Sequence, residues 1–153
     1  ETGGIIGNGD ITMDWIVHVL KRTVDTQYRT KADRRHTFLA GSSMGGLMTL
    51  YGLLAYPEVF SRGAALSPSL WIDAEKVKAM IRHARVKRNT VLYMDYGALE
   101  FADHPHSRSL FAEVSALLIE KRVLLNSRIV PRGTHCEASW EKQIPFFMKT
   151  LFE

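Results

Sequence analysis

Apolar residues recur at steps of three and four positions near the start of the chain. After Asp10 this stripe comprises Ile11, Trp15, Ile16, Val19, Leu20 and Val24. Such spacing puts side chains on one face of a helix, so we predict an amphipathic helix from residue 10 to about residue 26. Residues 1–9 contain four glycines and show no periodicity. We expect them to form a flexible leader.

The rest of the chain alternates short apolar runs with longer segments of helical periodicity. The runs predict strands at residues 36–41, 62–66, 90–96 and 124–130. The other segments predict helices at residues 47–56, 73–84, 107–121 and 137–151. This alternation favours a parallel sheet with helices on both faces, which is an α/β fold with three layers.

Composition and charge exclude several classes of protein. The 153 residues are 46% hydrophobic and 24% charged, which suits one globular core. The net charge is only +4 and the basic residues are scattered, so we expect no nucleic-acid partner. No apolar run approaches the roughly 18 residues of a membrane span, and Cys136 has no partner for an internal disulfide. No signal peptide is visible, which leaves a cytoplasmic location as the default expectation.

The segment from Gly41 to Gly46, GSSMGG, lies between a predicted strand and a predicted helix. The pattern G-x-S-x-G in this context indicates a nucleophile elbow, in which a sharp turn exposes a serine held in a strained conformation. Glycine at positions 41 and 45 is expected to avoid collisions in that turn. We therefore predict Ser43 as a nucleophile and the N–H of Met44 as an oxyanion donor. A glycine-serine turn without chemistry is the alternative.

Three segments together resemble one branch of the α/β-hydrolase superfamily. They are FLAGSSMGGL at residues 38–47, YPEVF at residues 56–60 and ALSPSLW at residues 65–71. This branch includes enterochelin-esterase-like, feruloyl-esterase-like and esterase D-like enzymes, and the similarity extends from about Asp14 to the C-terminus. The resemblance implies a serine hydrolase that cleaves carboxylic esters through an acyl-enzyme intermediate, without a cofactor or metal ion.

A serine nucleophile needs a general base, and the chain has six histidines. His135 follows the last predicted strand in a glycine-containing loop, where the chain order serine, acid, histidine of these hydrolases puts the base. The segment from Gly133 to Trp140 also resembles the family's G-x-H-x-E-x-x-W motif, in which Glu137 is expected to cap the next helix. His104 and His106 have no third ligand at metal-site spacing.

The acid of a catalytic triad is expected in the loop after the third predicted strand. The candidates there are Asp95, Glu100 and Asp103. Residues 96–100, YGALE, resemble the family's G-x-x-D/E element, whose last residue is the acid. This resemblance favours Glu100, with Asp103 as the fallback, while Asp95 is expected to be hydrogen-bonded to backbone. The acid would hold the correct tautomer of His135.

A substrate pocket is expected around the elbow. Its predicted lining comprises Ser42, Ser67, Ser69, Trp71 and Trp140. Residues 67–71 follow the second predicted strand, and a purely structural corner is the alternative for them. Trp140 is most simply a core anchor that also forms a wall of the pocket.

The family's usual domain is longer than this chain. We expect residues 10–153 to form a single esterase domain without the family's first strands, which leaves the strand at residues 36–41 on an exposed sheet edge. A homodimer could complete that sheet. The leading hypothesis is a serine esterase acting on a small-molecule ester. The alternatives are a catalytically weak hydrolase domain that acts in binding or assembly, and an acyltransferase of the same fold.

Overall fold

A parallel sheet of four strands forms the centre of the protein. The computed structural model describes residues 7–102 and 105–153. The strands are paired in the order β1-β2-β3-β4, and their bounds are β1 (Phe38–Ser42), β2 (Arg62–Leu66), β3 (Val91–Gly97) and β4 (Leu124–Val130). All three pairings are parallel. The strands that the apolar runs predict are therefore confirmed.

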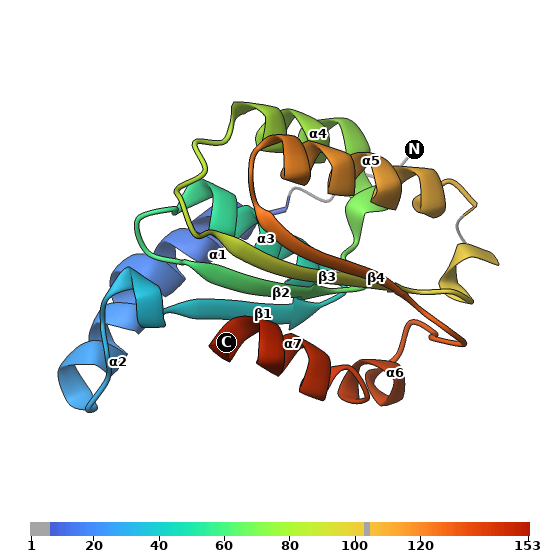
Figure 1. The fold of residues 1–153 in the computed structure, drawn as a ribbon. Coiled ribbons are helices and arrows are strands. Elements are labelled where there is room, and N and C mark those ends of the chain that lie inside the picture. The colour runs from blue at the N-terminus through green and yellow to red at the C-terminus, as the bar shows by residue number, and fades with distance from the viewer. Residues whose placement is uncertain (1–6, 103–104) are drawn as a thin grey trace.

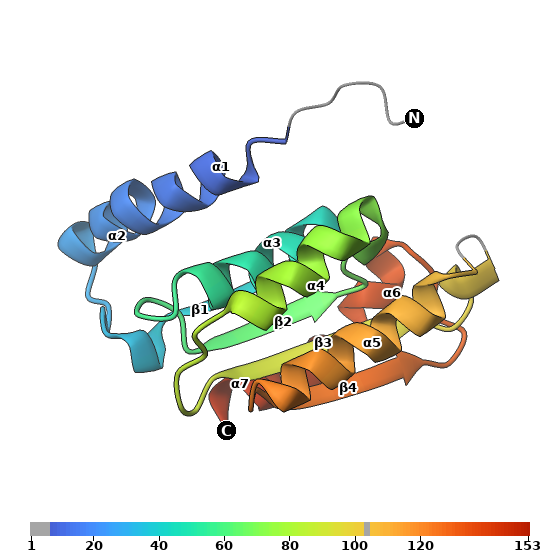
Figure 2. The same ribbon diagram turned by 90° about the horizontal axis from the view of Figure 1, so that it is seen from above.

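Helices cover both faces of the sheet (Figure 1). One face carries α3 (Met44–Ala55), α4 (Ala74–His83) and α5 (Ser107–Glu120). The other carries α6 (Glu137–Glu141) and α7 (Ile144–Phe152). The segment formed by α1 (Gly9–Trp15), the π-helix η1 (Ile16–Leu20) and α2 (Lys21–Gln27) lies on the β1 side of the sheet, where α1 contacts α3 (Figure 2). Short 3₁₀ turns are η2 (Arg34–His36), η3 (Leu70–Asp73) and η4 (Glu100–Ala102). Figure 2 shows α3, α4 and α5 over the sheet and α1 beside α3 on the β1 side, which agrees with the three-layer α/β prediction.

Two apolar clusters hold the layers together. The larger one joins the sheet to α3, α4 and α5, and its fully buried members include Leu50, Ile81 and Val114. The smaller one lies on the opposite face, where Leu151 of α7 packs against Tyr93 of β3. Burial on both faces explains why the central strands β2 and β3 are continuous apolar runs instead of alternating ones.

The C-terminal segment differs from its prediction. The single helix expected over residues 137–151 is instead two helices, α6 and α7, separated at residues 142–143. Pro145 provides the physical reason, because proline lacks an N–H and cannot continue a helix but fits the first turn of a new one. At the other end, Gly9 of the expected leader belongs to α1. Residues 1–6 lie outside the described part of the chain.

The first helical segment forms as predicted, but it does not bury the predicted stripe. Ile11 is 65% exposed, Trp15 51% and Val19 49%, while Met13 and Val17 point into the core. Beside this segment, β1 pairs only with β2 among the described residues. The strand before the elbow therefore lies at a sheet edge, as the sequence predicts.

Candidate active site

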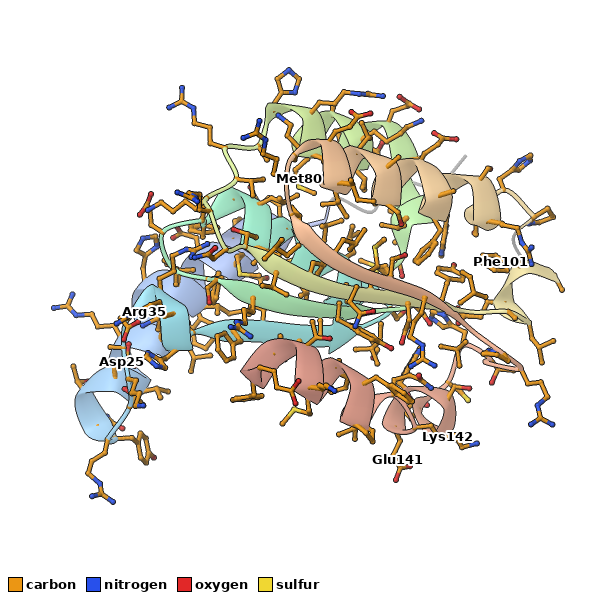
Figure 3. The ribbon with its side chains drawn as sticks, in the orientation of Figure 1. Asp25, Arg35, Met80, Phe101, Glu141 and Lys142 are labelled. Atoms are coloured by element: carbon orange, nitrogen blue, oxygen red, sulfur yellow. The ribbon has the colours of Figure 1, made fainter. Side chains whose placement is uncertain are left out.

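The predicted site residues meet at the carboxyl end of the sheet. Ser43 follows β1, Glu100 follows β3 and His135 follows β4. Because the strands are parallel, all three loops emerge at the same edge. In Figure 3 the labelled Phe101 of η4 and Glu141 of α6 lie near this end of the sheet.

The turn from β1 into α3 has the geometry of a nucleophile elbow. Ser43 has a φ of 55°, in the left-handed region that L residues rarely adopt. Its N–H donates to the carbonyl of Leu66 at 2.9 Å, and its own carbonyl accepts from Leu47 and Ser69. These bonds fix the strained backbone between β2 and the first turn of α3. Met44 opens that turn, where N–H groups have no intrahelical acceptor.

His135 lies between Ser43 and Glu100. Its Nε2 is 2.8 Å from Ser43 Oγ, and its Nδ1 is 2.7 Å from Glu100 Oε2. The histidine side chain is 41% exposed, whereas that of Glu100 is 3% exposed. One ring nitrogen therefore faces a buried carboxylate and the other faces a hydroxyl at the surface. This arrangement allows the ring to take a proton from Ser43 while the carboxylate stabilises its charged form.

Glu100 is held by more than the histidine. Its Oε1 accepts from the N–H of Gly97 at 2.8 Å and from Ser67 Oγ at 2.7 Å. A Cβ on Gly97 would lie 2.5 Å from that same oxygen and 2.5 Å from the backbone of Gly133. The two glycines therefore allow the loops after β3 and β4 to approach closely enough for Glu100 to reach His135.

Asp95, another of the acid candidates, makes its hydrogen bonds away from the histidine. Asp95 accepts from the hydroxyl of Tyr93 at 2.7 Å and from the N–H of Ser67 at 3.1 Å, so the expected bond to backbone is confirmed. Burial is the main cause that raises the pKa of the Asp95 carboxyl. Asp103 lies outside the described residues. Glu100 is thus the candidate acid that the structure brings to His135.

Two of the predicted pocket residues are involved in other contacts. Ser67 is only 2% exposed and hydrogen-bonds Glu100, so its hydroxyl supports the candidate acid, and its role in lining a substrate pocket stays a prediction. Trp140 packs edge-on against the His135 ring at 5.0 Å and donates its indole N–H to Ser67, so it supports the site from behind. Sequence reasoning missed this connection because it depends on side chains far apart in the chain.

The remaining predicted pocket residues lie around the elbow. Ser69 is buried with its Oγ 3.3 Å from Ser43 Oγ, and Trp71 is 48% exposed on η3. Ser42 is half-buried at the end of β1. A cleft of about 640 Å³ runs between α1, α3 and α4, with Leu47 and Ile72 among its lining residues, but Ser43 is not one of them. Within the described ranges, no three acidic, histidine or cysteine side chains cluster as metal ligands would.

A family comparison agrees with this geometry. The model of the family described as "Putative esterase" matches residues 10–148. The chain belongs to this esterase family. The assignment supports the expected class of carboxylic ester hydrolases and the recognition made from the elbow and its companion segments.

Individual proteins similar to this chain carry the names of esterases or serine hydrolases. The iron(III) salmochelin esterase of Escherichia coli O6:H1 strain CFT073 is 35% identical over 71 residues, which cover 46% of this chain and 17% of that protein. An IroE-like serine hydrolase from Shewanella oneidensis superposes with a TM-score of 0.75 at 20% identity, covering 95% of this chain and 47% of the other. The enterobactin esterase FES from Shigella flexneri gives a TM-score of 0.68 at 24% identity, covering 91% and 36%.

The comparisons also show how much of each relative this chain covers. It spans less than half the length of each of these three relatives. The structural matches establish the shared fold. None of the helices in the described part of the chain has both the length and the apolar character needed to cross a membrane.

Proposed function

We propose that this protein is a serine esterase in which Ser43, His135 and Glu100 form the catalytic triad. The observation that carries the proposal is the position of the His135 ring, 2.8 Å from Ser43 Oγ and 2.7 Å from Glu100 Oε2. Serine hydroxyls are weak nucleophiles unless an adjacent base removes the proton, and a histidine oriented by a carboxylate is such a base.

The reaction proceeds in two halves. Ser43 Oγ attacks the ester carbonyl carbon while His135 Nε2 takes its proton, and the N–H of Met44 donates to the developing oxyanion. The tetrahedral intermediate collapses, the bond to the alcohol oxygen breaks, and the alcohol leaves with the proton from His135. Water then attacks the acyl-Ser43 ester by the same route and releases the carboxylic acid. Glu100 stabilises the imidazolium in both halves.

A fluorophosphonate probe tests this function directly. We expect the wild-type chain to be labelled and the Ser43→Ala variant not to be labelled. The matched control is Ser109→Ala, which removes an exposed hydroxyl on α5 that donates to the backbone carbonyl of His106. Equal labelling of the folded wild type and Ser43→Ala would contradict the proposal.

The names of the relatives guide the choice of substrates. Salmochelin, enterobactin and ferulic acid appear in the names of related esterases, so siderophore esters and ferulate esters come first in a substrate panel. Simple acyl esters serve as reference substrates. Including a competing alcohol distinguishes hydrolysis from acyl transfer, because a transferase forms the new ester and a hydrolase forms the free acid.

A role in assembly is the second candidate function. It is favoured by the exposed side chains of Ile11, Trp15 and Val19 and by the unpaired edge of β1 in the described chain. Pairing of this edge with a second copy would complete the sheet as the predicted homodimer, which stays a prediction. Sedimentation velocity over a range of concentrations measures whether the dimer forms.

A further inference from the structure

Behind the proposed triad, two side chains continue the hydrogen-bond chain into the core. Trp140 Nε1 lies 3.0 Å from Ser67 Oγ, which lies 2.7 Å from Glu100 Oε1. Ser67 is 2% exposed and Glu100 is 3% exposed. We propose that Ser67 and Trp140 are positioning residues that orient Glu100 and thereby set the tautomer of His135. The inference rests on the proposed function, since it concerns the same triad.

The direction of each hydrogen bond follows from the chemistry of the groups. An indole N–H can only donate, so Ser67 Oγ is the acceptor from Trp140. The single hydroxyl proton of Ser67 is then directed to Glu100 Oε1. An ionised carboxylate has only acceptors, which matches the two donors that converge on this oxygen, the Ser67 hydroxyl and the Gly97 N–H.

The orientation of the carboxylate determines the protonation of the histidine. With Oε1 occupied by two donors, Oε2 is the oxygen that accepts from His135 Nδ1 at 2.7 Å. A proton on Nδ1 leaves Nε2 of the neutral ring as an acceptor for the Ser43 hydroxyl at 2.8 Å. The Trp140 ring also contacts the His135 ring edge-on, 5.0 Å between centroids. Trp140 thus restrains both the base and the support of its acid.

The tautomer of His135 provides a test that does not require turnover. Long-range ¹H–¹⁵N correlation spectra of ¹⁵N-histidine-labelled protein, recorded where the ring is neutral, distinguish a proton on Nδ1 from one on Nε2. We expect Nδ1–H in the wild type and a mixture of both forms in Ser67→Ala. The matched control is Ser61→Ala, which removes another buried serine hydroxyl, one without a hydrogen-bond partner among the described residues. It should keep the wild-type tautomer.

A second variant separates positioning from folding. Ser67 has a φ of 41°, which glycine adopts without strain, so Ser67→Gly removes the hydroxyl without straining the backbone. Ser67→Ala and Ser67→Gly should therefore differ in stability but show the same loss of the Nδ1–H form. Trp140→Phe keeps an aromatic ring beside His135 but lacks the N–H, and it should shift the tautomer less than either Ser67 variant.

Turnover provides the second readout. Outer partners of a functional group typically contribute about 10- to 100-fold, so kcat should fall by about this factor in both Ser67 variants. KM should stay unchanged because Ser67 is buried behind the triad. Folded Ser67 variants with the wild-type tautomer and the wild-type kcat would overturn the inference. Turnover that survives in Ser43→Ala would instead refute the proposed function, and the tautomer measurement would still decide the role of Ser67.

Discussion

The two glycines of the G-x-S-x-G motif should respond very differently to a single added methyl group. An ideal Cβ at Gly41 would lie 2.5 Å from both the carbonyl carbon and the carbonyl oxygen of Gly45, whereas ordinary contact begins at 3.4 Å. The turn must therefore open by almost 1 Å, because the colliding atoms belong to the backbone and cannot rotate away. A Cβ at Gly45 meets no described atom within 4 Å.

These contacts set the size of the expected effects. Gly41→Ala should lower the free energy of unfolding by about 1–3 kcal/mol, the usual cost of overpacking. A displacement of about 1 Å at the nucleophile should slow fluorophosphonate labelling about 100-fold. Gly45→Ala, inside α3, should leave labelling unchanged and raise stability by up to about 1 kcal/mol.

Urea denaturation measures the free energy of unfolding, and the rate of fluorophosphonate labelling is measured on the same samples. The comparison is informative because the two variants add the same atom on either side of Ser43. A Gly41→Ala protein with wild-type stability and wild-type labelling would refute the steric argument. A Gly45→Ala protein whose stability and labelling rate fall as much as those of Gly41→Ala would also refute it.

Three further predictions concern the acid, a buried carboxyl and the exposed helix face. Glu100→Gln should slow labelling about 10³- to 10⁴-fold, since an amide N–H facing the histidine favours the wrong tautomer, while the exposed Glu137→Gln should label normally. Burial raises the pKa of the Asp95 carboxyl, so this group keeps its proton to higher pH in the folded state than in the unfolded state. Its contribution to stability therefore decreases as the pH rises above 3.8. Urea titrations from about pH 4 to 6 should show a smaller decrease in Asp95→Asn. Trp15→Lys changes an exposed side chain, so it should abolish concentration-dependent sedimentation and change the free energy of unfolding by no more than about 0.5 kcal/mol. Met13→Ala changes a buried side chain, so it should lower the free energy of unfolding by about 2–5 kcal/mol. A wild-type chain that sediments as a monomer at every concentration would contradict the Trp15 prediction.

The features that the sequence predicted well are those that depend on local chemistry. The strand bounds at residues 62–66 and 124–130 agree with β2 and β4, because apolar runs between turn residues carry that information. The elbow is equally local, since strain at Ser43 and the close approach of Gly41 to Gly45 arise within five residues. Sequence reasoning nevertheless overestimated the steric need for glycine at position 45, because a Cβ there would meet no described atom within 4 Å.

The features that escaped prediction depend on contacts between distant segments. Ser67 belongs to the loop after β2 and Trp140 to α6, and the two residues meet only because the loop and the helix reach the same sheet edge. The one available signal was the pair of glycines, Gly97 after the third strand and Gly133 before the histidine. Glycine at both positions indicates that two backbones approach closely, but it does not indicate which side chain fills the space beside them.

The exposed stripe on the first helix has a physical cause that its periodicity could not reveal. The segment carries apolar residues on two faces, and Met13 and Val17 take the face toward α3. The π-helix over Ile16–Leu20 adds a wider turn, which changes the angular position of the residues after it relative to a regular helix. Apolar spacing alone predicts a helix without specifying which face is covered. Figure 2 shows α1 and α2 on the β1 side of the sheet, so a partner that covers the second face would lie near the free edge of β1. For this reason Trp15→Lys is the sharper test of association: it perturbs the apolar face while leaving the strand edge intact.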